Sequence, residues 1–182
     1  MRKNILRAQA AFPAVMLFVM VAAVATTACR VSYSLSGASI SPLAKTVSIA
    51  YIPNNASMVA PILSPTLRDA LQDRFMGQTR LSVVREGGDF AFEGEITGYT
   101  AQPSAMSSSS GMDAGASLYK LTITVHMRFT NSIEPKLSYD KSFSKCAEYD
   151  ANKLLQSVEP TLIPEIVDQL VDDIFNAATS NW

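Results

Sequence analysis

The stretch LYKLTITVHMRFT, residues 118–130, decides the fold of this chain. Apolar and polar side chains alternate along it with a period of two, which is the spacing of a β-strand. The side chains expected on the apolar side are Leu121, Ile123, Val125, Met127 and Phe129. Those expected on the other side are Thr122, Thr124, His126, Arg128 and Thr130. Such one-sided alternation predicts a sheet with one face buried and one face wet.

Shorter alternations on both sides of this stretch predict further strands. We expect them at Thr46–Ile52, Leu81–Arg85, Phe90–Thr100 and Leu137–Tyr149. In the third of these, Phe90, Phe92 and Ile96 alternate with Glu93, Glu95 and Thr97. The last runs back along residues 118–130 after a turn at residues 131–136, which predicts an antiparallel pair.

Two segments have the spacing of amphipathic helices. The first is expected to begin at Ser64-Pro65, because serine caps free amides and proline needs no N–H at the first helical position, and to end near Gly77. The second carries a wide apolar stripe from Leu162 to Ala178. Pro160 and Pro164 indicate that a fresh helix begins there, after a short segment with Leu154, Leu155 and Val158.

The element order is strand, helix, three or four strands and helix. It predicts an α+β fold, a two-layer sandwich in which two helices pack on one face of a four- to five-stranded, mostly antiparallel sheet.

The first 29 residues have the pattern of an export signal. Arg2, Lys3 and Arg7 precede the apolar run Ala14–Ala25. Twelve helical residues span roughly 18 Å, which is short of the hydrocarbon core of about 30 Å, so a signal sequence is favoured over a membrane span.

Small residues and then Cys29 follow this run. The arrangement resembles the lipobox of bacterial lipoproteins, although Thr26 replaces the usual leucine. We therefore expect a signal peptide at 1–28, a tether lipidated at Cys29 over 29–45 and a single domain over 46–182. The alternative is an ordinary signal peptide that is cleaved nearby, with an incidental cysteine.

Charge and cysteine content exclude several classes of protein. Without Arg2, Lys3 and Arg7 the chain has 12 basic and 16 acidic residues, a formal charge of −4. Nucleic acid is therefore not expected as a partner, because phosphate binding needs a surplus of lysine and arginine. With Cys29 lipidated, Cys146 has no cysteine with which to form an internal disulfide.

No set of residues predicts catalysis or metal binding. His126 is the single histidine, and it falls on the polar side of its strand. Cys146, beside Lys145, is interpreted as a plain thiol, and Glu93 and Glu95 as solvated strand residues. We expect no enzyme activity, no metal site and no cofactor.

Four stretches of the mature sequence resemble the LptE family, the lipopolysaccharide-assembly lipoproteins of Gram-negative outer membranes, in matching chain order. They are YSLSGASI before KTVSIAYI; TLRDALQDRFMGQTRLSVV; FEGEITGYT with LYKLTITVHMRF; and KSFSKCAEYDAN leading into EIVDQLVDDIFNAATSNW. The resemblance implies two helices against a sheet, as the patterns already predict. It also implies a lipid-anchored, periplasm-facing protein of the outer membrane that plugs an LptD-type β-barrel, helps to assemble it and binds lipopolysaccharide.

Two sets of residues suit those tasks. A plug in a wet barrel lumen needs a polar surface, so barrel contacts are expected at Ser107, Ser108, Ser109, Ser110, Thr122, Thr124 and His126. Anionic phosphates need cations, so lipopolysaccharide contacts are expected at Lys120, Arg128, Lys136, Lys141 and Lys145. The alternative function is a lipid-tethered periplasmic module that binds another envelope protein or a small ligand.

Overall fold

A computed structural model describes residues 40–104 and 118–179 of the chain. The predicted Cys29 lipidation and the serines Ser107 to Ser110 lie outside these residues. The elements in chain order are β1 (Thr46–Ile49), α2 (Leu63–Gln78), β2 (Ser82–Val84), β3 (Phe90–Pro103), β4 (Leu118–Asn131), the 3-10 turn η1 (Pro135–Leu137), β5 (Tyr139–Asp150) and α3 (Leu155–Thr179).

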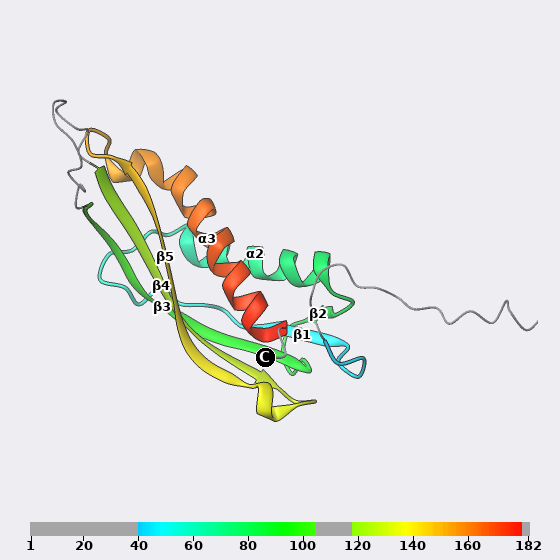
Figure 1. Cartoon of the computed structure of the whole chain (residues 1–182). Helices are drawn as coiled ribbons and strands as arrows, with labels where there is room; N and C mark the ends of the chain where they lie inside the picture. Colours follow the sequence, from blue (N-terminus) through cyan, green and yellow to red (C-terminus); the bar gives the residue numbers. More distant parts are fainter. Residues whose placement is uncertain (1–39, 105–117, 180–182) are drawn as a thin grey trace, which may run out of the picture. The chain divides into compact units, whose positions relative to one another are not determined.

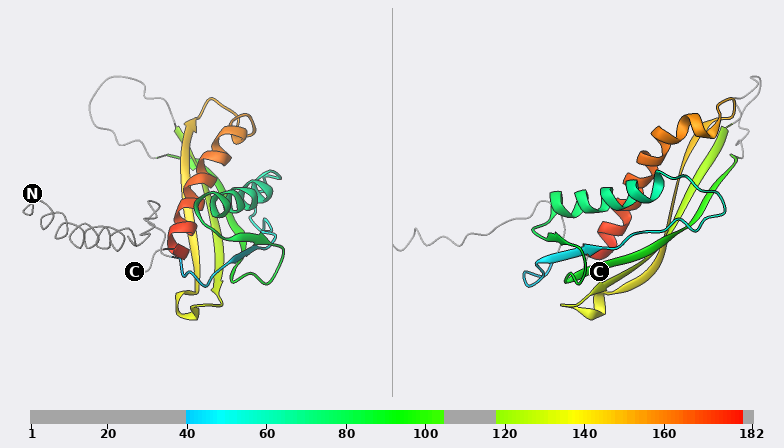
Figure 2. Two further views of the ribbon diagram at one scale, coloured as in Figure 1. Left: turned by 90° about the vertical axis from the view of Figure 1, so that its right-hand side faces the viewer. Right: turned by 180° about the vertical axis from the view of Figure 1, so that it is seen from behind.

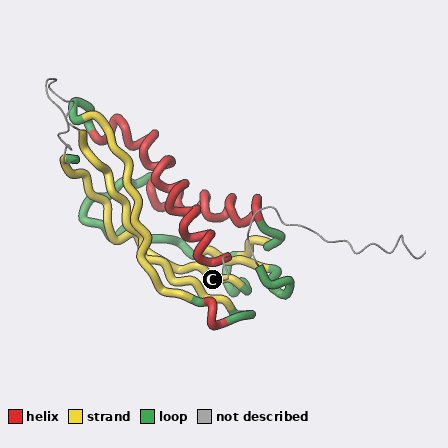
Figure 3. The backbone as a smooth tube through the Cα atoms, in the orientation of Figure 1, coloured by secondary structure: helices red, strands yellow, loops and turns green. Residues whose placement is uncertain are grey.

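The strands form one five-stranded mixed sheet in the order β2-β1-β3-β4-β5. Strand β1 runs parallel to β2 and β3, and the long strands β3, β4 and β5 pair antiparallel. Both helices lie on the same face of this sheet (Figures 1, 2 and 3). The predicted α+β fold, with a mostly antiparallel sheet and two helices on one face, is confirmed.

Strand β4 has the two faces that its sequence predicts. Leu121, Ile123, Val125, Met127 and Phe129 are all fully buried against the helices. Burying an apolar side chain of this size contributes about 1.5–3 kcal/mol, so this row is a large part of the driving force for the sheet to meet the helices.

An aromatic cluster joins the two layers. The Phe75 ring of α2 lies 5.0 Å from the Phe92 ring of β3 and 5.1 Å from the Phe175 ring of α3, measured between centroids. Phe92 stacks on Phe129 of β4 at 4.8 Å. Each such pair contributes about 0.5–1.5 kcal/mol beyond its buried area, so the cluster fixes how the helices sit on the sheet.

Strand β3 contains an irregularity that alternation alone does not predict. Its register with β4 shifts between Ile96 and Gly98, so Thr97 is the extra residue of a bulge. Before the bulge Phe90, Phe92 and Ile96 face the helices; after it Tyr99 does, and it is 1% exposed. The bulge therefore reverses which residues of β3 face the core.

The ends of α2 differ from the prediction. The helix begins at Leu63, and Ser64 is buried in its first turn and makes no capping hydrogen bond. Leu63 is the first member of the buried i, i+4 stripe that continues through Leu67 and Leu71, so the helix begins two residues before the expected first helical residue, Pro65. Gly77 lies inside the last turn, and the helix ends where the Thr79 amide and hydroxyl both donate to Phe75 O.

The expected break before α3 is wrong. One continuous helix runs from Leu155 to Thr179, with Pro160 and Pro164 inside it. A proline inside a helix costs about 3 kcal/mol because it removes a hydrogen bond and crowds the carbonyl four residues earlier. Those carbonyls belong to Gln156 and Pro160, which are exposed to water, and the long buried stripe of α3 outweighs the cost.

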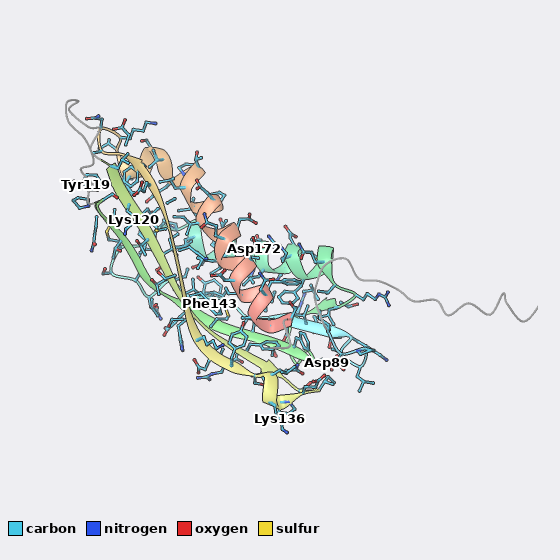
Figure 4. The ribbon with its side chains drawn as sticks, in the orientation of Figure 1. Asp89, Tyr119, Lys120, Lys136, Phe143 and Asp172 are labelled. Atoms are coloured by element: carbon cyan, nitrogen blue, oxygen red, sulfur yellow. The ribbon has the colours of Figure 1, made fainter. Side chains whose placement is uncertain are left out.

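The start of β1 is held by Asp89 in the loop before β3 (Figure 4). The Asp89 carboxylate accepts hydrogen bonds from Lys45 N at 2.8 Å, Thr46 N at 3.0 Å and Thr46 Oγ1 at 2.9 Å. These bonds favour the ionised carboxylate, first of all the one from Lys45 N, and they lower the Asp89 pKa. Just before them, Ile40 and Ala44 of the expected tether pack against the core.

We predict that Gly94→Ala destabilises the domain by about 1–3 kcal/mol, because overpacking forces the main chain to move. A Cβ at Gly94 would collide with the main-chain oxygen of His126 on β4. Gly77→Ala is the matched control: a Cβ there meets nothing within 4 Å, and alanine is the better helix former. Urea unfolding of both variants measures the difference. Equal stability of Gly94→Ala and the wild type would show that the β3–β4 contact is looser than described.

Candidate functional site

The sheet face opposite the helices is the candidate site, and we call it the open face. It is formed by the side chains of β3, β4 and β5 that alternate with the buried rows. Its polar residues are Glu93, Glu95, Thr100 and Gln102; Lys120, Thr122, Thr124, His126, Arg128 and Thr130; and Asp140, Ser142, Ser144, Cys146, Glu148 and Asp150. Ala91 and Leu118 are apolar residues at its two ends.

A charged cluster occupies the half of the open face nearer to η1. His126 Nε2 lies 2.5 Å from Asp140 Oδ1, and Arg128 Nε donates to Asp140 Oδ2 at 3.2 Å. The hydrogen bond from Arg128 is the main cause that lowers the pKa of Asp140, and His126 adds to it. The only histidine of the chain therefore has a structural partner, and it lies on the polar side of its strand as the sequence predicts.

Hydroxyl groups occupy the middle of the open face. Thr124 Oγ1 and Ser144 Oγ lie 3.0 Å apart, within hydrogen-bonding distance, and Thr97 Oγ1 donates to Thr124 O at 3.4 Å. A hydroxyl both donates and accepts, so this row can pair with main chain or polar side chains of either type on a second surface.

Carboxylates outnumber permanent cations on the open face. In the register of the sheet, Lys120 lies opposite Glu148, while Arg128 lies between Glu93 and Asp140. With Glu95 and Asp150, five carboxylates face two permanent cations. An anionic phosphate finds no surplus of positive charge here.

The structure does not bring the five predicted lipopolysaccharide contacts together. Lys120 and Arg128 are on the open face, whereas Lys141 and Lys145 are on the helix side of β5, opposite the buried Met127 and Ile123. Lys145 Nζ is ion-paired with Asp173 Oδ2 of α3 at 2.8 Å, and Lys141 Nζ lies 5.4 Å from the centre of the Tyr139 ring.

The fifth cation, Lys136, is in η1, and it lies at the opposite end of the long strands from Lys120 (Figure 4). Binding of lipopolysaccharide by these five residues stays a prediction, and it applies to separate positions rather than to one patch. The predicted barrel contacts Thr122, Thr124 and His126 do lie together, on the middle strand of the open face.

A cleft that the sequence analysis did not predict lies between the loop after β1, strand β3 and the start of α3. Its volume is about 500 Å³, and it is lined by Met58, Val59, Tyr99, Leu154, Leu155, Gln156 and Glu159. Its rim includes exposed apolar side chains, since Val59 is 63% exposed and Leu154 is 78% exposed.

Inside this cleft, Tyr99 Oη donates to Glu159 Oε1 at 2.6 Å. Burial, together with this carboxylate, raises the pKa of Tyr99. The bulge at Thr97 turns Tyr99 inward, so the cleft depends on a feature that side-chain alternation does not reveal.

Two further observations concern metal binding and membrane crossing. Within residues 40–104 and 118–179, no three or more histidine, cysteine, aspartate or glutamate side chains are grouped so that they could hold a metal ion. In the same part of the chain, neither helix is long and apolar enough to cross a membrane.

The fold and the open face define a class: a two-layer α+β domain that covers one face of its sheet with helices and presents the other as a polar surface. Residues 44–178 match the LptE family, which is described as lipopolysaccharide-assembly. The chain belongs to the LptE family, and the resemblance seen in its sequence is confirmed. No curated protein matches it.

Solved structures of low sequence identity are also similar to this chain. A hypothetical protein from Chlamydia trachomatis has a TM-score of 0.50 at 9% identity and covers 76% of this chain and 99% of its own. A minor lipoprotein from Acinetobacter baumannii has a TM-score of 0.49 at 13% identity, covering 75% and 94%. Rare lipoprotein B from Shewanella oneidensis has 0.47 at 14%, covering 75% and 95%. The first of these likenesses is one of fold alone, so the family assignment depends on the sequence match.

We predict that Arg128 controls the ionisation of Asp140. The carboxyl pKa of Asp140, measured by NMR titration, should lie below the ordinary value of about 3.9 and should rise toward it in Arg128→Ala. A lowered folded-state pKa contributes stability above about pH 3.9, and this contribution is lost as the pH falls through the folded value. The free energy of unfolding of Asp140→Asn should therefore be lower than that of the wild type at neutral pH. The two values should converge as the pH falls below the folded-state pKa of Asp140. An unchanged Asp140 titration in Arg128→Ala would contradict this arrangement.

Proposed function

We propose that this protein is an outer-membrane lipoprotein subunit of the lipopolysaccharide translocon, with no catalytic role. It assembles with an LptD-type β-barrel, plugs the lumen and assists assembly of the barrel. Membership of the LptE family supports this role, because the family is one of lipopolysaccharide assembly. The observation that carries the proposal is the open face, a broad polar sheet surface that the helices leave uncovered.

The chemistry of the open face suits the inner wall of such a barrel. The lumen of an outer-membrane barrel is polar, so a surface that meets it must offer hydrogen bonds rather than apolar contacts. Thr122 and Thr124 are half-buried by their neighbours, whereas Arg128 is 61% exposed. The short threonine side chains would form close contacts with the inner wall of the barrel. The longer charged side chains would change conformation to fit it.

Attachment to the membrane would come from the N-terminal segment. In this proposal Cys29 carries acyl chains, each buried methylene of which contributes about 0.8 kcal/mol, and holds the domain at the periplasmic side of the outer membrane. The domain would then meet its barrel while both are confined to one membrane surface.

Depletion of the protein in its own cells tests the role directly. We expect the barrel to misassemble and lipopolysaccharide to accumulate in the periplasm, because the barrel would lose the subunit that fits its lumen. Immunoblots of the barrel and surface labelling of lipopolysaccharide measure the two effects. Normal barrel and normal surface lipopolysaccharide after depletion would exclude the proposed function.

Cys146 offers a test of the proposed surface. Its side chain is on the open face and is exposed in the isolated domain. In outer membranes solubilised with mild detergent, we expect a bulky maleimide to label Cys146 at least tenfold more slowly than in the purified protein. The matched control is the same preparation from cells depleted of the barrel, where the fast rate should return. Fast labelling in the presence of the assembled barrel would show that the open face is not the contact surface.

The alternative function, a lipid-tethered module for a small ligand or another envelope protein, is favoured by one observation, the cleft beside Tyr99 with its apolar rim. It predicts that affinity purification from solubilised membranes returns a different envelope complex and no barrel. Depletion would then leave lipopolysaccharide at the surface unchanged.

A further inference from the structure

Strand β5 ends the sheet, and among the described residues no strand pairs with its outer edge. It is 12 residues long and pairs with β4 in one unbroken register from Tyr139 to Asp150. At about 3.4 Å per residue, its edge is about 40 Å long.

The hydrogen bonds between β3 and β4 show which residues of β5 direct their main-chain N–H and C=O groups to this edge. Ser104 N donates to Leu118 O at 2.8 Å, and Ser132 N donates to Asp89 O at 2.9 Å, so even-numbered residues in and next to β4 bond toward β3. Successive strand residues direct their N–H and C=O groups to opposite sides, so odd-numbered residues of β4 bond toward β5, where their partners are also odd-numbered. The residues of β5 that direct N–H and C=O to the free edge are therefore Asp140, Ser142, Ser144, Cys146 and Glu148.

This edge lacks several of the features that protect sheet edges from pairing. Proteins protect an edge with charged side chains, lysine above all, with proline, with a bulge, with a very short strand or with a covering element. Strand β5 does carry charges, Lys141 and Lys145 among them. Strand β5 has no proline and no bulge, and the side chains at the centre of its outward set are the small Ser142, Ser144 and Cys146. Helix α3 packs on its face, where Tyr139 Oη donates to Ile174 O at 3.1 Å.

A second copy of the chain does not fit this edge. In an antiparallel pair of two β5 strands, residues whose N–H and C=O point to the free edge must lie opposite each other. Two registers meet this condition with the largest number of paired residues. One places Asp140 opposite Glu148 of the second copy at both ends. The other places Lys145 opposite Lys145 and Asp140 opposite Asp150. Like charges directly opposite each other in a sheet are destabilising, so both registers are disfavoured.

We propose that β5 binds an extended segment of a protein partner, which adds a sixth strand to the sheet. On the helix side of this edge Lys141, Phe143 and Lys145 alternate, so the matching segment carries acidic residues on either side of an apolar one. The strands of a closed barrel are paired on both edges, so this segment comes from a loop or a periplasmic part of the partner. The proposal rests on the proposed function only in taking the barrel protein as the partner to be tested.

The variants Ser142→Pro and Ser142→Ala test the pairing. Both remove the same exposed hydroxyl, but only proline removes the outward N–H, which an edge strand tolerates. Ser142 lies on the open face, so Ser142→Ala is the reference that shows the effect of losing the hydroxyl alone. We expect Ser142→Pro to bring down at most a tenth of the barrel protein that Ser142→Ala brings down. The melting temperatures of the purified variants check that both fold. Full retention by folded Ser142→Pro would overturn the proposal, whereas wild-type protein that brings no barrel would contradict the proposed function.

If Ser142→Pro does not fold, hydrogen exchange of the wild-type chain tests whether a partner segment pairs with the edge of β5. We expect the peptide covering residues 139–149 to exchange at least tenfold more slowly in outer membranes than in the purified lipoprotein, because outward amides such as Ser144 N become bonded. Unchanged exchange would overturn the proposal. Slow exchange without co-purified barrel protein would support the pairing at the β5 edge but contradict the proposed function. A concentration-dependent dimer, formed by wild type and Ser142→Ala but not by Ser142→Pro, would replace the partner segment with a second copy.

Discussion

The structure depends on one constraint: the apolar residues of β4 must all be buried on the same side of the sheet. They occupy every second position over the length of the strand, so covering them requires elements as long as the strand itself. Helix α3 packs over β4 and β5, and α2 packs over β1 and β2 and against α3. The rings of Phe75, Phe92, Phe129 and Phe175 form one cluster where the two layers meet. Because the helices are used on one face, the polar residues of β4 are left on a face that no described element covers.

The same constraint explains how the charged groups are arranged. On the helix side, Arg74 of α2 binds Asp168 at 2.9 Å and also Asp172 of α3, and Lys145 binds Asp173. The acidic side of α3 is thus held by cations from both neighbouring elements. On the open face Asp140 holds His126 and Arg128. Of the cations predicted for phosphate binding, Arg128 and Lys145 are therefore ion-paired within the domain. The open face is polar without a positive surplus.

Much of this architecture follows from the sequence, because strand alternation and helical spacing are local signals. The faces of β4 and the stripe of α3 are predicted by counting residues. The bulge at Thr97 is not, since it depends on how β3 meets β4, and it alone turns Tyr99 into the core and forms the cleft. The continuity of α3 through Pro160 and Pro164 also escapes local reasoning, because tertiary burial outweighs the local cost of proline. For the site, Thr122, Thr124 and His126 were predicted to share a face, which follows from strand period. The division of the cations between two faces follows from the same period, because Lys141 and Lys145 share the parity of the core-packed Tyr139 and Phe143 on β5.

In the proposed complex the open face, rather than the helical layer, contacts the barrel. This contact can be tested with a photo-crosslinking amino acid placed at Thr124 in the living cell, with the exposed Glu165 of α3 as the comparison position. We expect a strong crosslink to the barrel protein from position 124 and a weaker one from position 165. Equal crosslinks from both positions, or a stronger one from the helix, would contradict it.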